Sequence, residues 1–165
     1  EASPVEPVRT MTLDITEDTT TGKINAVLNM DYSYTYSYTF RNCISLKEIN
    51  IPNVLAIPDQ AFANCTSLET VEVDEGLTTI GANAFQNCVA LDDVMIPAAV
   101  KSIGQNAFKG CKGICGEVRL PSTVKYIEPH AFDGCKGIGR LLYPKSATLA
   151  KGAFAGLGLF KAKKY

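Results

Sequence analysis

The sequence has no long apolar run, no excess of charge of one sign, and only one histidine. Without 18 consecutive apolar residues, no segment is predicted to span a membrane. The 16 basic and 17 acidic side chains leave a net charge of −1, which excludes a generally basic nucleic-acid-binding protein. A zinc site needs four ligands, which one histidine and widely spaced cysteines supply poorly, and we expect neither a metal nor a cofactor.

The chain does have enough apolar residues for a core, since 46% of its 165 residues are hydrophobic. This share is too high for a disordered chain. The first residues, Glu1-Ala2-Ser3-Pro4, lack the basic start and the apolar stretch of a signal peptide. We therefore expect either a cytosolic protein or the mature part of an exported one.

A repeat of 22 to 24 residues runs through most of the chain. Its clearest copy passes from Ile80-Gly81 through Ala84-Phe85 to Cys88 and Leu91. Such fixed spacing is typical of a solenoid, whose coils stack to bury a face that none could bury alone. We predict about five full coils and a partial last one, marked by the phenylalanines Phe40, Phe62, Phe85, Phe108, Phe132 and Phe154.

The hydrophobic periodicity changes within each copy. Alternating apolar residues, such as Val94 and Ile96, predict a half-buried strand, and stretches such as residues 100–103 predict a second, shorter one. The Ala-Phe-x-x-Cys-x-x-Leu stretch places its apolar residues three apart, which suits one or two short helical turns. One extra residue between Ile114 and Val118 predicts a bulge in that strand.

The consensus of these copies, L-x-x-I-x-I-P-x-x-V-x-x-I-G-x-x-A-F-x-x-C, resembles the BspA-type leucine-rich repeat over residues 35–160. The resemblance implies an α/β solenoid, a right-handed leucine-rich repeat array with a parallel β-sheet, over residues 35–165. It also implies a surface-exposed or secreted protein like those of mucosa-associated bacteria and some protozoa, which are often implicated in adhesion.

Residues 1–34 precede the repeat and are predicted to form a linker followed by a β-hairpin that caps the first coil. Four tyrosines then alternate with serine and threonine: Tyr32, Tyr34, Tyr36 and Tyr38. One interpretation, which we favour, is a strand whose aromatic face closes the end of the core. The other is an exposed aromatic platform for sugar rings.

Five of the six cysteines share one repeat column: Cys43, Cys65, Cys88, Cys111 and Cys135. The sixth position of that column is Leu157, so the cysteines act as small apolar fillers and are predicted to be buried thiols rather than disulfides. Cys115 lies outside the column and could form a nucleophilic pair with His130. No third orienting group or oxyanion-hole motif accompanies them, so a thiol enzyme is a remote alternative and no catalytic residue is predicted.

Charge is divided between the two parts of the chain. Residues 1–100 carry 14 acidic and 4 basic side chains, net −10, whereas residues 101–165 carry 3 acidic and 12 basic ones, net +9. Sequence order is spatial order in a solenoid, so the charge should separate from end to end. One interpretation is a solvated surface that avoids self-repulsion. The other is a basic end that attracts anionic partners.

Residues between the buried ones of parallel strands point outward together. This predicts two exposed columns, varied in charge and shape: Glu48, Thr70, Asp93, Glu117 and Arg140 in one, and Asn50, Glu72, Met95, Arg119 and Leu142 in the other. We therefore hypothesise a non-enzymatic cell-surface or secreted module for protein interaction or adhesion, whose partner is a host or extracellular-matrix protein or glycoprotein. The alternative is a module that binds an anionic glycan through the tyrosines and the basic C-terminal end.

Overall fold

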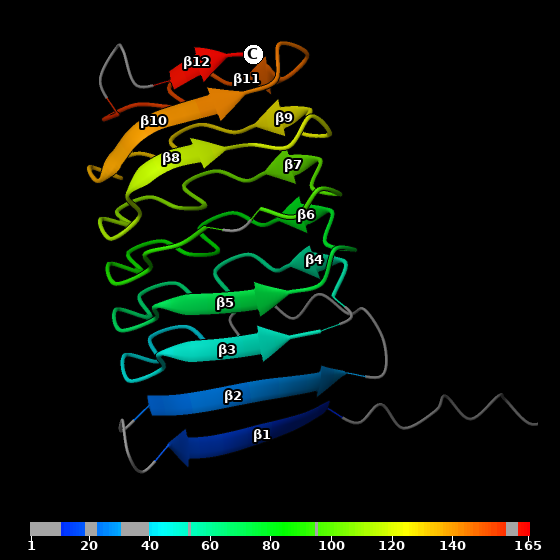
Figure 1. Ribbon diagram of the computed structural model, residues 1–165, viewed down its shortest axis with the longest axis vertical. Helices are drawn as coiled ribbons and strands as arrows, with labels where there is room; N and C mark the ends of the chain where they lie inside the picture. The colour runs from blue at the N-terminus through cyan, green and yellow to red at the C-terminus, as the bar shows by residue number, and fades with distance from the viewer. Residues whose placement is uncertain (1–10, 19–22, 31–39, 53, 95, 158–161) are drawn as a thin grey trace, which may run out of the picture.

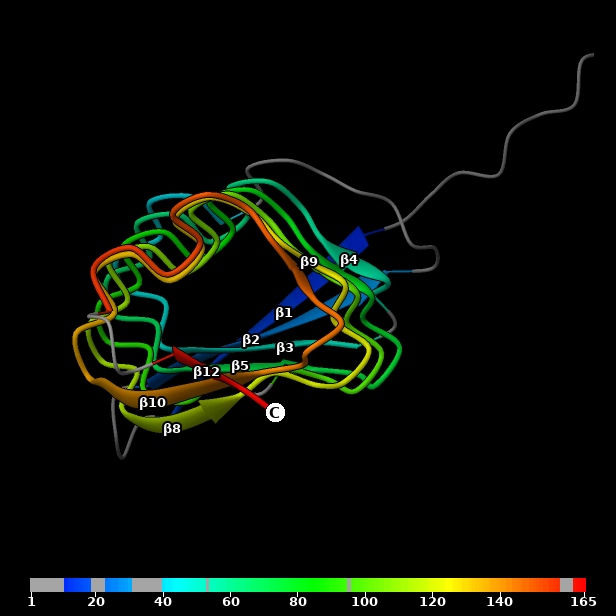
Figure 2. The ribbon, with the colours of Figure 1, turned by 90° about the horizontal axis from the view of Figure 1, so that it is seen from above.

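The computed structural model describes residues 11–18, 23–30, 40–52, 54–94, 96–157 and 162–165. Its coils stack along the long axis, and their order in space follows their order in the sequence (Figure 1). Seen along that axis, the coils have one side of long strands, one of short strands and one of turns (Figure 2). The described residues contain no helix, and therefore none that could cross a membrane.

The long strands form the main sheet, which begins with an antiparallel hairpin of β1 (Met11–Asp18) and β2 (Lys23–Met30). β2 pairs in parallel with β3 (Glu48–Ile51), and β3 pairs in parallel with β5 (Thr70–Val73). The predicted hairpin is thus confirmed in these two strands. It occupies the N-terminal edge of the sheet and continues its hydrogen bonding.

The main sheet is interrupted in the third coil, where the predicted strand around Val94 and Ile96 is wrong. The described residues of 92–97 form no strand, and β5 is the last strand of its sheet. In the register of the repeat, a strand there would place Asp93 opposite Thr70 and diagonally beside Glu72, and like charges so close to each other repel. Aspartate is also disfavoured within strands, and the segment begins with two of them, Asp92 and Asp93.

Beyond the interruption, a separate parallel sheet continues the same side with β8 (Gly116–Arg119), β10 (Ile138–Tyr143) and β12 (Ala162–Lys164). The extra residue of the fourth coil lies at its start. Gly116 has a φ of 75°, which glycine adopts without strain. The register between β8 and β10 shifts between Ile138 and Arg140. Ile138 pairs with Gly116 and Arg140 with Glu117, so the unpaired residue is Gly139 of β10, and the bulge predicted between Ile114 and Val118 lies in the facing strand instead.

The short strands form a second, unbroken parallel sheet: β4 (Ala56–Ile57), β6 (Thr79–Ile80), β7 (Ser102–Ile103), β9 (Tyr126–Ile127) and β11 (Thr148–Leu149). The second residue of each of the first four strands is a buried isoleucine. Neighbouring isoleucines are paired in register from one coil to the next. The predicted second strand of each coil is thus confirmed.

The core is organised around a stack of phenylalanine rings. Centroids of successive rings from Phe40 to Phe132 lie 5.2 to 5.4 Å apart, with interplanar angles of 16° or less. The last pair, Phe132 and Phe154, is 6.2 Å apart and tilted by 41°. Since the middle rings each contact a ring on both sides, the coils depend on one another for burial.

Beside the rings runs a ladder of thiols. Each buried cysteine donates a hydrogen bond to the phenylalanine carbonyl of the preceding coil, as Cys88 Sγ does to Phe62 O at 3.1 Å. The other three pairs are Cys65 to Phe40, Cys111 to Phe85 and Cys135 to Phe108, each at 2.9 Å. All six cysteines are free, including the five of the repeat column for which free thiols were predicted.

Cys43 departs from the predicted column because its side chain is exposed. It belongs to the first coil, and among the described residues no coil stacks below it to supply a covering side chain or a carbonyl. Ile44, the next residue, is 62% exposed, but its column is exposed in the later coils too, at Thr66, Val89, Lys112 and Lys136. Burial of the cysteine column therefore requires a preceding coil.

The helical turns predicted around each phenylalanine are wrong. In the third coil, Gln86 and Cys88 donate backbone hydrogen bonds three residues back, to Asn83 and Phe85, as in successive β-turns. The amides that alternate with these, at Phe85 and Asn87, donate instead to carbonyls of the next coil, at 2.8 Å each. A helix would use every amide within its own coil, whereas these alternate between turn and stack.

Left-handed residues make these turns possible. Two columns have positive φ throughout: Asn42, Asn64, Asn87, Gly110, Gly134 and Gly156 in one, and Gln60, Asn83, Asn106, His130 and Gly152 in the other. Asparagine and glycine tolerate this conformation best. The asparagine side chains add a ladder of their own, since Asn87 Nδ2 donates to Asn64 Oδ1 at 3.0 Å and Asn64 to Asn42 likewise.

Candidate interaction surface

The residues of the two predicted outward columns lie in two separate groups along the array and do not form one continuous surface. In the first group, Glu48 is paired in register with Thr70, and Asn50 with Glu72. In the second, Glu117 is paired with Arg140. The interruption of the main sheet separates the groups, with Asp93 exposed beside it. Met95 lies outside the described residues.

The exposure of these residues varies. The columns are exposed at Asn50, Glu72, Asp93, Glu117, Arg119 and Arg140, and half-buried at Glu48 and Thr70. Leu142 was predicted to be exposed, and this is wrong because its side chain is only 8% exposed. Tyr165 explains the difference. It follows β12, and its hydroxyl donates to the carbonyl of Leu120 at 2.6 Å, so its ring passes over β10.

Both arginines of the columns already have partners. The guanidinium carbon of Arg119 lies 4.0 Å from the centroid of the Tyr165 ring, a cation–π contact. Arg140 Nη1 lies 3.4 Å from Glu117 Oε2, in an ion pair whose side chains are both about half exposed. An exposed pair of this kind contributes little stability. Glu117 does, however, neutralise the positive charge of Arg140, which the hypothesis of a basic end would use to attract an anionic partner.

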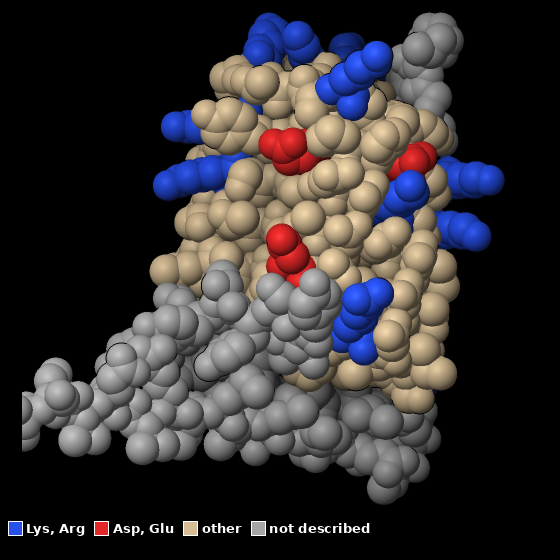
Figure 3. All heavy atoms as spheres, turned by 180° about the vertical axis from the view of Figure 1, so that it is seen from behind, with Lys and Arg blue, Asp and Glu red and all other residues tan. Residues whose placement is uncertain are grey.

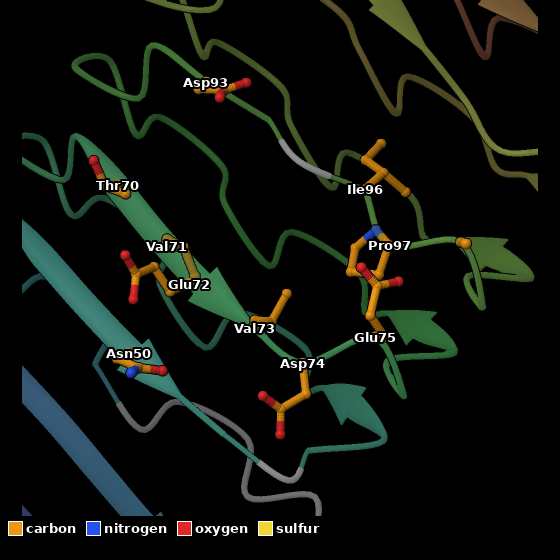
Figure 4. Close-up of a pocket in the computed structure, with 11 residues that line it drawn as sticks. Asn50, Thr70, Val71, Glu72, Val73, Asp74, Glu75, Asp93, Ile96 and Pro97 are labelled. Carbon is orange, nitrogen blue, oxygen red and sulfur yellow. The ribbon is translucent and has the colours of Figure 1, made fainter.

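A groove opens where the main sheet is interrupted (Figure 4). It has a volume of about 600 Å³, which is within the range of ligand-binding pockets. Its walls come from β3, β5 and the segments that follow β5 and Asp93. The lining residues are Asn50, Thr70, Val71, Glu72, Val73, Asp74, Glu75, Asp93, Ile96, Pro97 and Ala98. Four of the predicted outward residues therefore meet here: Asn50, Thr70, Glu72 and Asp93.

The solvent-facing side of the groove is acidic, and its side toward the core is apolar. Four carboxylates line it, and no lysine or arginine appears among the described residues of its wall. A smaller cavity of about 30 Å³ shares Val71, Val73 and Asp93 with the groove and extends to the rings of Phe85 and Phe108. The main sheet thus covers the core incompletely at this point.

Basic side chains gather on the C-terminal coils. On the face opposite the main sheet, lysines and arginines outnumber acidic side chains over these coils (Figure 3). Asp133 is one of the few acidic groups, and it lies 3.7 Å from Lys109 Nζ and 3.5 Å from His130 Nδ1. Because coil order follows sequence order, the separation of charge runs along the long axis.

The cysteine and histidine hypothesis gains no support from the geometry. In the described part of the chain, no hydrogen bond or ion pair joins exposed Cys115 to His130, and no group of three His, Cys, Asp or Glu could hold a metal. Burial raises the pKa of the Cys65 and Cys135 thiols to about 12. It also raises the pKa of Cys88 and Cys111, so all four thiols stay protonated and unreactive. The tyrosines Tyr32, Tyr34, Tyr36 and Tyr38 lie outside the described residues.

The groove itself was missed by sequence reasoning, although two signals were present. Asp74-Glu75 stands where other copies have the strand-ending proline, and Asp92-Asp93 precedes the interrupted strand. Each pair alone resembles an ordinary solvated turn. Only the stacking of the second coil on the third brings Asp74, Glu75 and Asp93 to one groove.

Comparisons with known proteins agree with this architecture. A family model described as the BspA type leucine rich repeat region matches residues 33–159 in six copies. The chain is similar to the crystal structure of a leucine-rich repeat protein of T. pallidum, with 26% identity and a TM-score of 0.67. The similarity covers 79% of this chain and 68% of that one. A search of curated proteins finds no match.

Two further crystal structures of leucine-rich repeat proteins are similar over a smaller share of their length. The one from Eubacterium ventriosum is 32% identical with a TM-score of 0.58, over 68% of this chain and 31% of that one. The one from Bacteroides ovatus is 23% identical with a TM-score of 0.58, over 88% of this chain and 49% of that one, and shares the fold. The chain thus spans about a third and about a half of these two proteins.

Proposed function

The chain belongs to the BspA-type leucine-rich repeat family, and on this basis we propose that it is a non-enzymatic protein-interaction module. It acts at a cell surface or after secretion, and binds a host or extracellular-matrix protein or glycoprotein through the outward face of its main sheet. Stacked repeats of this kind typically present such extended surfaces for binding proteins.

The observation that carries the proposal is the contrast between the two faces of the same strands. Inward residues are nearly uniform from coil to coil, as with Ile49 at 2% and Leu141 at 0% exposure. Outward residues change in charge along the array, from neutral Asn50 to acidic Glu72 and basic Arg119 in one column. A rigid array whose outward positions vary freely supports recognition of a particular partner surface.

The proposal is tested by charge reversal on two sides of the array. A main-sheet variant carries Glu72→Lys, Arg119→Glu and Arg140→Glu. A matched control on the side of short strands carries Lys101→Glu, Lys125→Glu and Glu128→Lys, with the same change in net charge. Both variants and the wild type are immobilised and exposed to extracellular-matrix and mucin proteins, and captured proteins are quantified by mass spectrometry.

We expect the main-sheet variant to lose at least one partner that the wild type and the control both capture. All six substituted residues are exposed, so the fold should survive, which circular dichroism verifies. Equal capture by the wild type and both variants, or loss in the control alone, would remove the main sheet from consideration as the binding face.

A further inference from the structure

The groove lies beside an unpaired strand edge. Within the described residues, β5 is hydrogen-bonded to β3 on one side and to no strand on the other. The open edge faces the groove that Asp93 borders on its far side (Figure 4). An edge with open N–H and C=O groups is a template for another strand. Extended peptides use such edges in strand addition.

The side chains of β5 alternate in a way that defines what such a strand should carry. Val71 and Val73 point toward the core, where they are only half-buried, whereas Ile49 and Ile51 of the preceding strand are 2% and 4% exposed. Thr70 and Glu72 point outward. A neighbouring strand would place alternate side chains on these same two faces. Its inward side chains should therefore be apolar, to complete the cover over the valines.

The outward side of the groove selects positive charge. Glu72, Glu75 and Asp93 are exposed carboxylates, contributed from both sides of the groove, with no cation among the described lining residues. A concave site lined by charge of one sign concentrates its field and attracts the opposite charge. By contrast, the acidic residue of the same face in the fourth coil, Glu117, is neutralised by Arg140.

We propose that this groove binds an extended peptide segment of a partner protein in which lysine or arginine alternates with apolar residues. The segment pairs with the open edge of β5, its apolar side chains lie against Val71 and Val73, and its cations lie beside Glu72 and Asp93. The proposal rests on the proposed function, since it names the chemistry of the partner at one point of the main sheet.

The test uses the full chain and a labelled peptide, acetyl-Lys-Val-Lys-Val-Lys-Val-amide, with binding followed by fluorescence anisotropy. The groove variant is Glu72→Gln with Asp93→Asn, which removes two charges and keeps side-chain shape. The control variant, Glu128→Gln with Asp92→Asn, removes two exposed charges outside the groove. We expect the groove variant to bind about tenfold more weakly and the control to bind like the wild type, since each exposed ion pair contributes a few-fold.

A second arm tests strand addition independently of charge and of variant folding. The same peptide with alternate backbone nitrogens methylated keeps every side chain but cannot donate those hydrogen bonds, and we expect it to bind at least tenfold more weakly. Absence of binding by the parent peptide, equal binding by the methylated peptide, or equal weakening in both protein variants would each overturn the proposal.

Two further readouts separate this inference from its alternatives. If a second copy of the chain were the occupant, the wild type would dimerise in analytical ultracentrifugation, the groove variant would not, and the peptide proposal would fall. If partner capture by the main sheet persists while the peptide does not bind, the proposed function stands and only the groove assignment is wrong.

Discussion

The two sheets of the solenoid solve the same stacking problem differently. The sheet of short strands has two residues per strand and runs without a break through five coils, from β4 to β11. The main sheet has longer strands, yet the described residues between β5 and β8 add no strand to it. Strand length therefore does not decide continuity here. What differs is the chemistry of the outward residues, which are small or hydroxylated on most of the short strands and heavily charged around the interruption.

The comparison indicates a division of labour. The short strands, the turns and the phenylalanine stack hold the coils together, because their contacts recur in every internal coil. The main sheet can then tolerate residues that weaken its own pairing. Local departures from structural regularity that are stabilised elsewhere often mark functional positions. The following predictions test whether the ring stack and the turns contribute most of the stability, and whether the main sheet beside the groove tolerates substitution.

The largest effect is expected from Phe108→Ala. This ring is 2% exposed and stacks on Phe85 and Phe132 at 5.3 and 5.2 Å, so its removal leaves a void against two coils. We expect the free energy of unfolding to fall by about 3–5 kcal/mol, as for other buried phenylalanines. Chemical denaturation measures it, with the exposed Lys101→Ala as control. A loss no larger than that of the control would contradict the idea that the stacked rings stabilise the array.

The next largest effect concerns the turns, through two substitutions of Asn87. Its φ is 60°, and its side chain donates to Asn64. Asn87→Ala should cost about 2 kcal/mol, since the hydrogen bond to Asn64 is lost and alanine lacks the polar side chain with which asparagine offsets the strain of a left-handed Cβ, about 1–2 kcal/mol. Asn87→Gly removes the hydrogen bond without the strain, so we expect about half that cost. Equal costs for alanine and glycine would show that φ does not matter at this position.

A third prediction follows from the buried thiols. The folded pKa of Cys65 is about 12 against an ordinary 9.0, so in the unfolded state this thiol loses its proton first as pH rises. The free energy of unfolding contributed by the thiol is thus present below pH 9 and is lost between about pH 9 and 12, at about 1.4 kcal/mol per pH unit. Cys65→Ala should reduce the slope of stability against pH by that amount.

The matched control is Thr66→Ala, an exposed neutral neighbour that should keep the wild-type slope. Denaturation midpoints between pH 9 and 11 give both slopes. If Cys65→Ala and the wild type lose stability in parallel, the thiol ionises as readily in the folded state as in the unfolded one, and its burial beside the Phe40 carbonyl is wrong.

The reach of sequence reasoning follows the same division. The spacing of phenylalanine, cysteine and isoleucine was sufficient to predict the coils, the second strands and the free thiols, because those columns depend on one residue type repeated in register. The helical turns were wrong because a spacing of three is shared by helices and by successive β-turns. A column that contains only asparagine and glycine, as at Asn87 and Gly110, was the available signal for left-handed turns.

The candidate site was less accessible to prediction. Outward positions such as Glu72 and Asp93 follow from the strand alternation, but their meeting in one groove depends on how the second coil stacks on the third. The burial of Leu142 depends on Tyr165, which lies 23 residues further along the chain and whose packing no local pattern encodes. Both failures involve contacts between coils that break the repeat, whereas the coils, second strands and free thiols that were predicted correctly depend on contacts that follow it.

The smallest predicted effect compares two valines that occupy the same inward column on either side of the interruption. Val118 of β8 is 6% exposed, whereas Val71 of β5 is half-buried beside the groove. Truncating a buried valine removes about 0.8 kcal/mol per methyl group and leaves a cavity, so Val118→Ala should cost about 2 kcal/mol. Val71→Ala should cost less than about 1 kcal/mol, because part of its side chain already contacts water. Urea denaturation of the two variants measures the difference directly. If the two costs are equal, then Val71 is as well covered as Val118, the main sheet closes over the third coil in solution, and the groove on which the peptide proposal depends does not exist.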